Sequence, residues 1–192
     1  MEKKLSPAII LDRDGTLHRD KEYLIRFEDF EPLPGIEEAL RMLQDKGFRL
    51  FVASNQSGVA RGFFSEQDVT ALNLKIQEYF RSHGVEIEDW VFCPHHAQGT
   101  VPAYTKDCEC RKPKPGLLLD LAKRHDLDLI NSYMVGDNIR DAEAGIAAGA
   151  TGVLIRTNSH GSLDKHMRLK EFPSMLEFAK SVRGVSASHA SE

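Results

Sequence analysis

The chain has few cysteines, no long apolar run and no excess of positive charge. Its 192 residues include 3 cysteines, which cannot all pair within one chain, so a disulfide framework is excluded. The formal net charge of -4 lacks the basic footprint that nucleic-acid-binding proteins usually carry. We therefore expect no nucleic acid among its partners.

The first residues, MEKKLSPAIILD, contain only a short apolar run before Asp12. That run is too short for the hydrophobic core of a signal peptide and far too short to span a membrane. We therefore expect a cytoplasmic protein with no membrane partner, in which the thiols stay reduced.

Short β-rich runs alternate with helical patterns along the chain. Strands are predicted over 8–11, 49–53, 89–92, 132–135 and 151–155, and helices over 35–46, 65–82, 115–125, 139–148 and 172–182. This alternation suits right-handed crossovers and predicts an α/β fold, a Rossmann-like open parallel sheet with helices on both faces. We expect residues 1–185 to form a single domain and the polar end, 186–192, to be a disordered tail.

Polar residues directly follow three of the predicted strands. The first strand is followed by Asp12-Arg13-Asp14-Gly15-Thr16, the second by Ser54-Asn55-Gln56 and the fourth by Asp137-Asn138. Ligands of open α/β sheets bind beyond the carboxyl ends of the strands. The three clusters are therefore expected to share one site.

The residue types in these clusters suit phosphoryl transfer. Asp12 would attack an electrophile while Asp14 exchanges a proton with the leaving group. The repulsion between the two carboxylates calls for a cation, and Asp137 would complete a Mg²⁺ site with them. Ser54 and Asn55 would donate hydrogen bonds to the phosphoryl group, and Lys112 would balance its charge.

The same residues also fit more common structural roles. Asp-x-Asp-Gly also begins calcium loops, but the twelfth position, which must be glutamate, is Tyr23. Singly, Asp137 is more often a helix cap and Ser54 a turn residue. Their joint position at the ends of three strands favours the functional interpretation.

All three cysteines lie in one stretch, 93–110. Cys93-x-His95 and Cys108-x-Cys110 offer three thiolates and one imidazole, which is typical of a closed, structural Zn²⁺ site. His96 is the alternative to His95, and inert or redox-active cysteines are the competing interpretation.

The zinc loop continues directly into a basic sequence. Cys110 precedes Arg111 and Lys112, so a bound metal would fix the backbone that presents these two side chains. A loop of this length is otherwise mobile.

Four motifs resemble those of the haloacid dehalogenase (HAD) superfamily over about residues 8–156: LDRDGTL, the serine of ASNQSG, the lysine of CRKPKPG and the aspartate of VGDN. The resemblance implies that Asp12 forms an aspartyl-phosphate and that Asp14 is the general acid and base, as in the phosphatases of the superfamily. Segments 15–53 and 55–111 are already occupied by predicted elements, which leaves no room for a separate cap domain.

Loop 93–110 resembles that of one HAD subgroup, shared by D,D-heptose 1,7-bisphosphate 7-phosphatases and bacterial histidinol-phosphate phosphatases. The stretch SNQSGVARGFFSE, residues 54–66, resembles the heptose group more closely. This implies a Mg²⁺-dependent enzyme that removes the 7-phosphate, as in the synthesis of activated heptose for lipopolysaccharide. Histidinol-phosphate phosphatase is the alternative, and a non-catalytic phosphate-binding or zinc interaction module is the third.

The same resemblance implies a set of substrate contacts. Arg111 contributes to recognition, while Ser54 and Lys112 stabilise the phosphoryl group. Arg61 is either a further contact or a solvated loop charge. We expect a monomer whose partner is a sugar bisphosphate. The expected pocket residues are Asp20, Lys21, Glu22, Tyr23, Ser54, Asn55, Gln56, Ser57, Arg111, Lys112 and Asn138.

Overall fold

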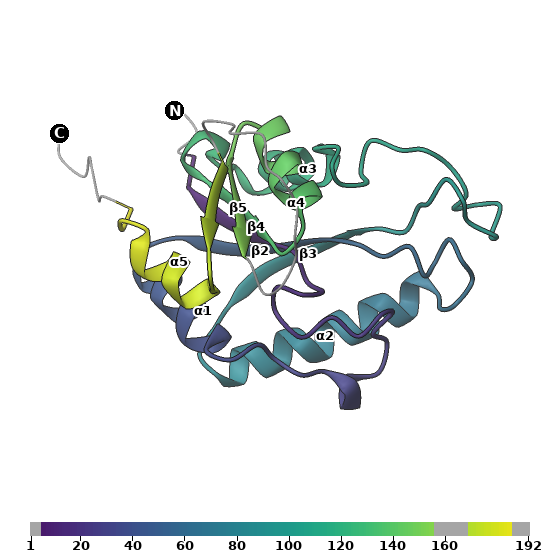
Figure 1. Cartoon of the computed structure of the whole chain (residues 1–192), viewed down its shortest axis with the longest axis horizontal. Coiled ribbons are helices and arrows are strands. Elements are labelled where there is room, and N and C mark those ends of the chain that lie inside the picture. Colours follow the sequence, from purple (N-terminus) through teal and green to yellow (C-terminus); the bar gives the residue numbers. More distant parts are fainter. Residues whose placement is uncertain (1–4, 156–168, 186–192) are drawn as a thin grey trace.

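The structure, a computed structural model, describes residues 5–155 and 169–185. Within these ranges, six strands form one parallel sheet in the order β3-β2-β1-β4-β5-β6 (Figure 1). The strands are β1 Ala8–Leu11, β2 Arg49–Asn55, β3 Ile87–Cys93, β4 Tyr133–Gly136, β5 Thr151–Ile155 and β6 Leu169–Phe172. The helices are α1 Ile36–Asp45, α2 Glu66–Ser82, α3 Gly116–His125, α4 Ile139–Ala147 and α5 Met175–Ser181, with 3₁₀ turns η1 Phe27–Asp29 and η2 Leu129–Asn131.

Helices cover both faces of the sheet. In Figure 1, α1, α2 and α5 lie on one side and α3 and α4 on the other. The central strand β1 supplies both cores, because successive side chains of a strand point to opposite faces. Ile9 and Leu11 belong to the larger apolar cluster, while Ile10 packs in the other with Leu118 and Ala144. The predicted α/β fold with a parallel sheet is confirmed.

Helix α2 shows how local sequence sets an element boundary. The backbone N–H of Ser65 donates to Oδ2 of Asp68 at 2.8 Å, and the N–H of Asp68 donates to Oγ of Ser65 at 3.2 Å. This reciprocal pair is a capping box, which satisfies two donors that the first turn leaves free. The predicted start of this helix is confirmed.

The C-terminal elements differ from the prediction. The helix expected over 172–182 begins only at Met175, where Oγ of Ser174 accepts the N–H of Glu177 at 3.2 Å. The preceding residues, LKEF, form the unpredicted strand β6, which is parallel to β5. The strand escaped prediction because it lies at the sheet edge and its two central residues are exposed. The tail predicted over 186–192 and the end of the family match at residue 156 lie outside the described residues.

The strand order changes direction between β1 and β4. The chain proceeds outward through β1, β2 and β3 and then returns to place β4 on the other side of β1. Segments 15–53 and 55–111, which were considered for a cap domain, contain only η1, α1, α2, β3, loops and most of β2. The carboxyl ends of β1, β2 and β4 are thus left without an inserted domain. None of the described helices is long and apolar enough to cross a membrane.

Candidate active site

A polar cavity opens where the strand order reverses, the position at which open α/β sheets bind ligands. Residues from β1, β2 and β4 and their following loops meet there. Its lining consists of Asp12, Asp14, Asp20, Asn55, Lys112, Asp137, Asn138 and Arg140. The three polar clusters predicted from the sequence therefore do meet at one edge of the sheet.

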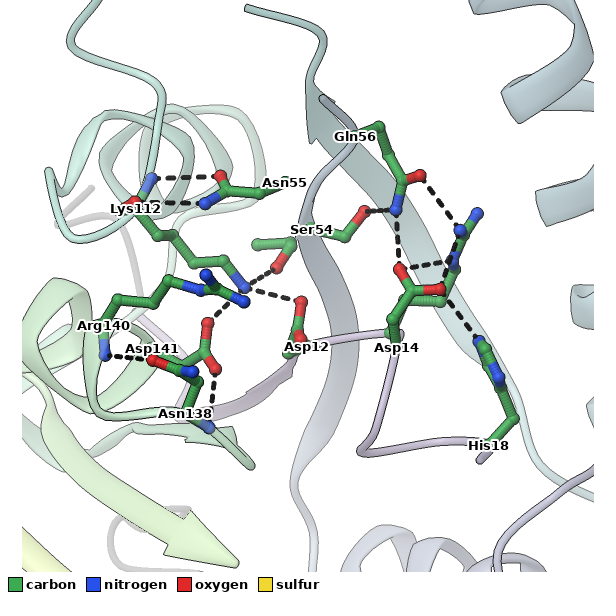
Figure 2. Close-up of polar contacts among 12 residues, drawn as sticks. Asp12, Asp14, His18, Ser54, Asn55, Gln56, Lys112, Asn138, Arg140 and Asp141 are labelled. Atoms are coloured by element: carbon green, nitrogen blue, oxygen red, sulfur yellow. Dashed lines mark hydrogen bonds and ion pairs between the residues drawn. The ribbon is translucent and has the colours of Figure 1, made fainter. Parts of the chain in front are cut away.

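Lys112 holds two buried carboxylates together at the base of this site (Figure 2). Its Nζ lies 2.7 Å from Oδ1 of Asp12 and 2.7 Å from Oδ1 of Asp141, and it donates to the carbonyl oxygen of Ala53 at 2.7 Å. Burial alone would lower the pKa of Lys112, but the two carboxylates raise it above its ordinary value. The lysine is therefore a cation at neutral pH.

Asn55 fixes the backbone of this lysine. Its Nδ2 donates to the carbonyl oxygen of Lys112 at 3.0 Å, and its Oδ1 accepts the N–H of Lys112 at 3.1 Å. Since Asn55 ends strand β2, the clamp ties the loop that carries Lys112 to the sheet. The lysine is held at both its backbone and its ammonium group.

Three carboxylates, those of Asp12, Asp137 and Asp141, have oxygens within 4.8 Å of one another. Burial raises the pKa of Asp12 to about 7, and the charges of Asp141 and Asp14 add to this while Lys112 opposes it. Burial and the charge of Asp141 raise the pKa of Asp137 to about 6. Crowded, partly desolvated carboxylates of this kind fit a small divalent cation that prefers oxygen ligands, as Mg²⁺ does.

Glycine is required where the first loop passes this cluster. Gly15 has a φ of +78°, and a Cβ atom there would lie 2.2 Å from Oδ2 of Asp137. Any side chain at this position would displace the Asp137 carboxylate. The absence of a side chain lets the loops after β1 and β4 close on each other.

The carboxylate of Asp14 points away from the acidic cluster (Figure 2). It accepts hydrogen bonds from Nε2 of Gln56 at 2.7 Å and from the Arg13 guanidinium at 3.0 and 3.1 Å, and Nε2 of His18 lies 3.3 Å away. Burial would raise its pKa, but the charge of Arg13 and the hydrogen bond with His18 hold the pKa of Asp14 well below its usual range. Of the three predicted Mg²⁺ ligands, Asp12 and Asp137 therefore lie together, and the carboxylate of Asp14 lies apart from them.

Arg13 is itself fully buried and anchors the Asp14 group to the body of the protein. Its Nη1 donates to Oδ1 of Asn73 in α2 at 3.0 Å, and its Nη2 donates to Oε1 of Gln56 at 3.0 Å. Ser54, also buried, accepts a hydrogen bond from Nε2 of Gln56 at 3.3 Å. The residues after β1 and β2 therefore form one polar network.

The cysteines and one histidine gather in a second cluster. The Sγ atoms of Cys93, Cys108 and Cys110 lie 3.2–3.5 Å apart, and Nδ1 of His95 lies 3.3 Å from Sγ of Cys110 and 3.7 Å from Sγ of Cys93. A tetrahedral zinc with Zn–S bonds of about 2.3 Å requires sulfurs roughly 3.8 Å apart, close to this spacing. The ring of His96 instead accepts the N–H of Gln98 through Nδ1 at 3.0 Å. The donor set therefore fits Zn²⁺ with His95.

Not all predicted substrate residues line the cavity. Asp20, Asn55, Lys112 and Asn138 do. Asp20 and its neighbours 21–23 are all exposed, and Lys21 pairs with Glu31 at 3.3 Å. Outside the lining lie Lys21, Glu22, Tyr23, Ser54, Gln56, Ser57 and Arg111.

Two residues of the site, Arg140 and Asp141, were missed from the sequence. Asp141 closes a capping box with Asn138 at the start of α4, so its spacing indicates a helix cap and nothing more. Its contact with Lys112 joins α4 to the loop before α3, and no local pattern reveals it. Arg140 carried no signal beyond its proximity to the VGDN motif.

Comparisons with known proteins agree with this geometry. A family described as haloacid dehalogenase-like hydrolase matches residues 9–88, and one described as HAD-hydrolase-like matches residues 109–182. Together with the parallel sheet and the paired aspartates after β1, these matches define a haloacid dehalogenase-like hydrolase.

More specific relatives are phosphatases. The D-glycero-beta-D-manno-heptose-1,7-bisphosphate 7-phosphatase of Rhodopseudomonas palustris is 46% identical over 146 residues, 76% of this chain and 81% of the relative. The Escherichia coli K12 enzyme of that name is 42% identical over 155 residues, 80% and 81% of the two chains. The crystal structure of D,D-heptose 1,7-bisphosphate phosphatase from B. bronchiseptica, complexed with magnesium and phosphate, matches with a TM-score of 0.78 at 30% identity, covering 91% of this chain and 96% of that one. The chain belongs to the family of these heptose-bisphosphate phosphatases.

Proposed function

We propose that the chain is a Mg²⁺-dependent phosphatase that hydrolyses the 7-phosphate of D-glycero-β-D-manno-heptose 1,7-bisphosphate. One observation carries the proposal: Lys112 holds the Asp12 carboxylate 2.7 Å from its ammonium group, inside a cluster of acids that fits Mg²⁺. The activity named for the relatives, at 42–46% identity, supports the substrate.

In the first step, an Asp12 oxygen attacks the phosphorus, and the bond between phosphorus and the oxygen on carbon 7 breaks. The leaving oxygen takes a proton from Asp14. The Asp14 carboxylate must first leave Arg13 and Gln56, which hold it in the ionised form, take up a proton from solvent and turn to the substrate. Lys112 and Ser54 stabilise charge on the transferring phosphoryl group. The product of this step is an aspartyl-phosphate on Asp12 and the free sugar hydroxyl.

In the second step, water attacks the aspartyl-phosphate. Asp14 now accepts the proton of that water, because the group that served as acid is left as the base. Inorganic phosphate leaves and Asp12 is regenerated. When bound, Mg²⁺ supplies positive charge that reduces the repulsion between the substrate phosphate and the carboxylates of the site. Asp12 and Asp137 would hold it, and Asp14 stays a predicted third ligand.

The zinc cluster would fix the position of neighbouring residues and take no part in the phosphoryl transfer. Cys93, His95, Cys108 and Cys110 would hold Zn²⁺ with no open ligand position, which is the structural type of site. Nη1 of Arg111 donates to the carbonyl oxygen of His95 at 3.1 Å, so the arginine depends on the loop conformation. Zinc would therefore hold in place the segment that carries Arg111 and Lys112.

The shape of the substrate supports removal of the 7-phosphate. This phosphate sits on a flexible primary carbon and would reach Asp12 at the base of the cavity. The ring with its 1-phosphate would stay at the rim, where Arg111 would contact it. We further propose a cytoplasmic monomer, because the thiolates require a reducing compartment and one chain supplies the whole cavity lining.

The proposal is tested by phosphate release from a panel of substrates with Mg²⁺: the heptose bisphosphate, other sugar bisphosphates and histidinol phosphate. We expect the heptose bisphosphate to have the highest kcat/KM, and ³¹P NMR to show the 1-phosphate still on the product. Faster turnover of histidinol phosphate, or release of the 1-phosphate first, would refute the proposal.

A further inference from the structure

Arg140 occupies an electrostatically unfavourable place in the fold. It lies in the first turn of α4, where its N–H donates to Oδ1 of Asn138 at 3.2 Å. The positive end of a helix dipole favours acidic side chains and disfavours cations at this position. Arg140 therefore stabilises α4 less than a neutral or acidic residue would.

The side chain of Arg140 extends over the active site. It lines the same cavity as Asp12, Asp137 and Lys112. In Figure 2 it reaches from α4 toward the side where Lys112 meets Asp12. A cation in this position faces whatever anion enters the cavity.

Arg140 lacks the carboxylate partner that two other arginines of the described helices have. Arg81 in α2 and Arg124 in α3 pair with Glu86 and Asp120, at 3.0 and 2.8 Å. Among residues 5–155 and 169–185, no carboxylate forms an ion pair with the guanidinium of Arg140. Its hydrogen-bonding capacity remains available to a ligand.

A second arginine near the cavity shares this property. Arg111 is half-buried, and its guanidinium donates to the carbonyl oxygen of His95. No carboxylate among the described residues forms an ion pair with it. Burial lowers the pKa of Arg111, and the charges of Arg140 and Arg61 lower it further. Two guanidinium groups close enough for their charges to interact can together bind an anion such as a phosphate group.

Lys112 cannot serve this second anion. Its ammonium group is buried and engaged by Asp12, Asp141 and a carbonyl oxygen, which places it at the transferring phosphoryl group. A substrate with two phosphates therefore needs further cations farther out.

We propose that Arg140 is a specificity-determining residue that, with Arg111, binds the phosphate that stays on the substrate. This inference rests on the proposed function, since it requires a bisphosphate. The competing role is compensation of the acidic cluster, because the charge of Arg140 also acts on Asp137.

The two roles are separated by kinetics of Arg140→Met on three substrates: the heptose bisphosphate, heptose 7-phosphate and p-nitrophenyl phosphate. We expect kcat/KM for the bisphosphate to fall about 10- to 100-fold, as for loss of a charged hydrogen bond, mainly through KM. The other two substrates, which lack the second phosphate, should lose far less, because Lys112 and Ser54 still contact the transferring phosphoryl group. Arg140→Lys should recover part of the loss, and Arg41→Met, an exposed arginine of α1, should have no effect.

A binding readout keeps this test independent of the proposed function. Heptose 1-phosphate should inhibit p-nitrophenyl phosphate hydrolysis competitively, with an inhibition constant about 10- to 100-fold higher in Arg140→Met. An unchanged constant, equal losses on all substrates, or a higher Mg²⁺ requirement would overturn the role of Arg140. Failure of the wild type to hydrolyse the bisphosphate would instead refute the proposed function.

Discussion

Asp12 and Lys112 stand 100 residues apart in the sequence, yet Oδ1 of one lies 2.7 Å from Nζ of the other. Both side chains are almost fully buried. The proposed nucleophile and the cation that would balance the transferring phosphoryl group are thus already in contact before substrate binds. Substitution of either residue should therefore remove a contact on which turnover depends.

Asp12→Asn should abolish turnover while the protein stays folded. The amide is nearly isosteric with the carboxylate but is a far poorer nucleophile, and losing a covalent nucleophile costs orders of magnitude in kcat. Asp14→Asn should lose about 10²- to 10⁴-fold, the usual contribution of general acid–base catalysis. Steady-state phosphate release and circular dichroism check both variants. Activity of Asp12→Asn above about a tenth of wild type would contradict its role as nucleophile.

Mg²⁺ binding should tighten as the pH rises through about 6 to 7. Asp137 and Asp12 have pKa values raised to about 6 and about 7, and each must lose its proton to act as a ligand. Calorimetric titration in buffers of different ionisation enthalpy should show proton release on binding. Asp137→Asn should weaken binding and flatten this pH dependence, and an affinity independent of pH from 5 to 8 would refute the assignment.

The same pKa shifts predict how Mg²⁺ stabilises the fold. A carboxyl group whose folded pKa lies above its unfolded value of 3.8 destabilises the folded protein as pH rises from about 4 toward 7. Metal-free protein should therefore lose stability across this window, and Mg²⁺ should raise Tm more at pH 8 than at pH 5. Differential scanning calorimetry with and without EDTA measures this.

Cys108→Ser should lower both stability and activity, because Zn²⁺ would then lack one of four ligands and the segment with Arg111 and Lys112 would loosen. Elemental analysis of reduced, purified protein should find one zinc per wild-type chain and less in the variant. The exposed residue Lys106 provides a control, since Lys106→Ser alters the same loop without touching the cluster. Wild-type protein without zinc would disprove the structural site.

Lys112→Met should destabilise the protein by about 3–5 kcal/mol, because Asp12 and Asp141 would remain buried without their cation. Activity should fall for every substrate, since the lost contact is with the transferring group itself. Lys114→Met is the matched control, because Lys114 pairs with Asp107 and Glu109 at the surface and such pairs add little stability. Urea denaturation of both variants compares the two free energies of unfolding, and equal values would contradict the buried role of Lys112.

Sequence patterns predicted the framework of this protein because its determinants are local. The apolar run of β1 and the Ser65–Asp68 capping box of α2 each indicate structure within a few residues. Strand β6 was missed because its conformation comes from pairing with β5 rather than from its own composition. The meeting of three polar clusters was predictable from the general rule for parallel sheets.

The finer geometry of the site depends on contacts that no local pattern records. Arg13 sits between Asp14 and Asn73 of α2, a partner 60 residues away. This contact turns the Asp14 carboxylate away from the acidic cluster. Asp141 has a local explanation as a helix cap, and that explanation concealed its second role beside Lys112.

The double use of Asp141 constrains how this protein can evolve. Its carboxylate caps α4 and forms an ion pair with Lys112. Its side chain also fills the space beside Gly136, where an added Cβ atom would lie 2.3 Å from the Cβ of Asp141. A substitution at Asp141 disturbs its contacts with both Lys112 and Gly136, and a substitution at either of those disturbs Asp141. Amino-acid substitutions at the start of α4 are therefore limited by the same selection that preserves turnover. Positions 112, 136 and 141 should be retained or exchanged together among descendants of this sequence.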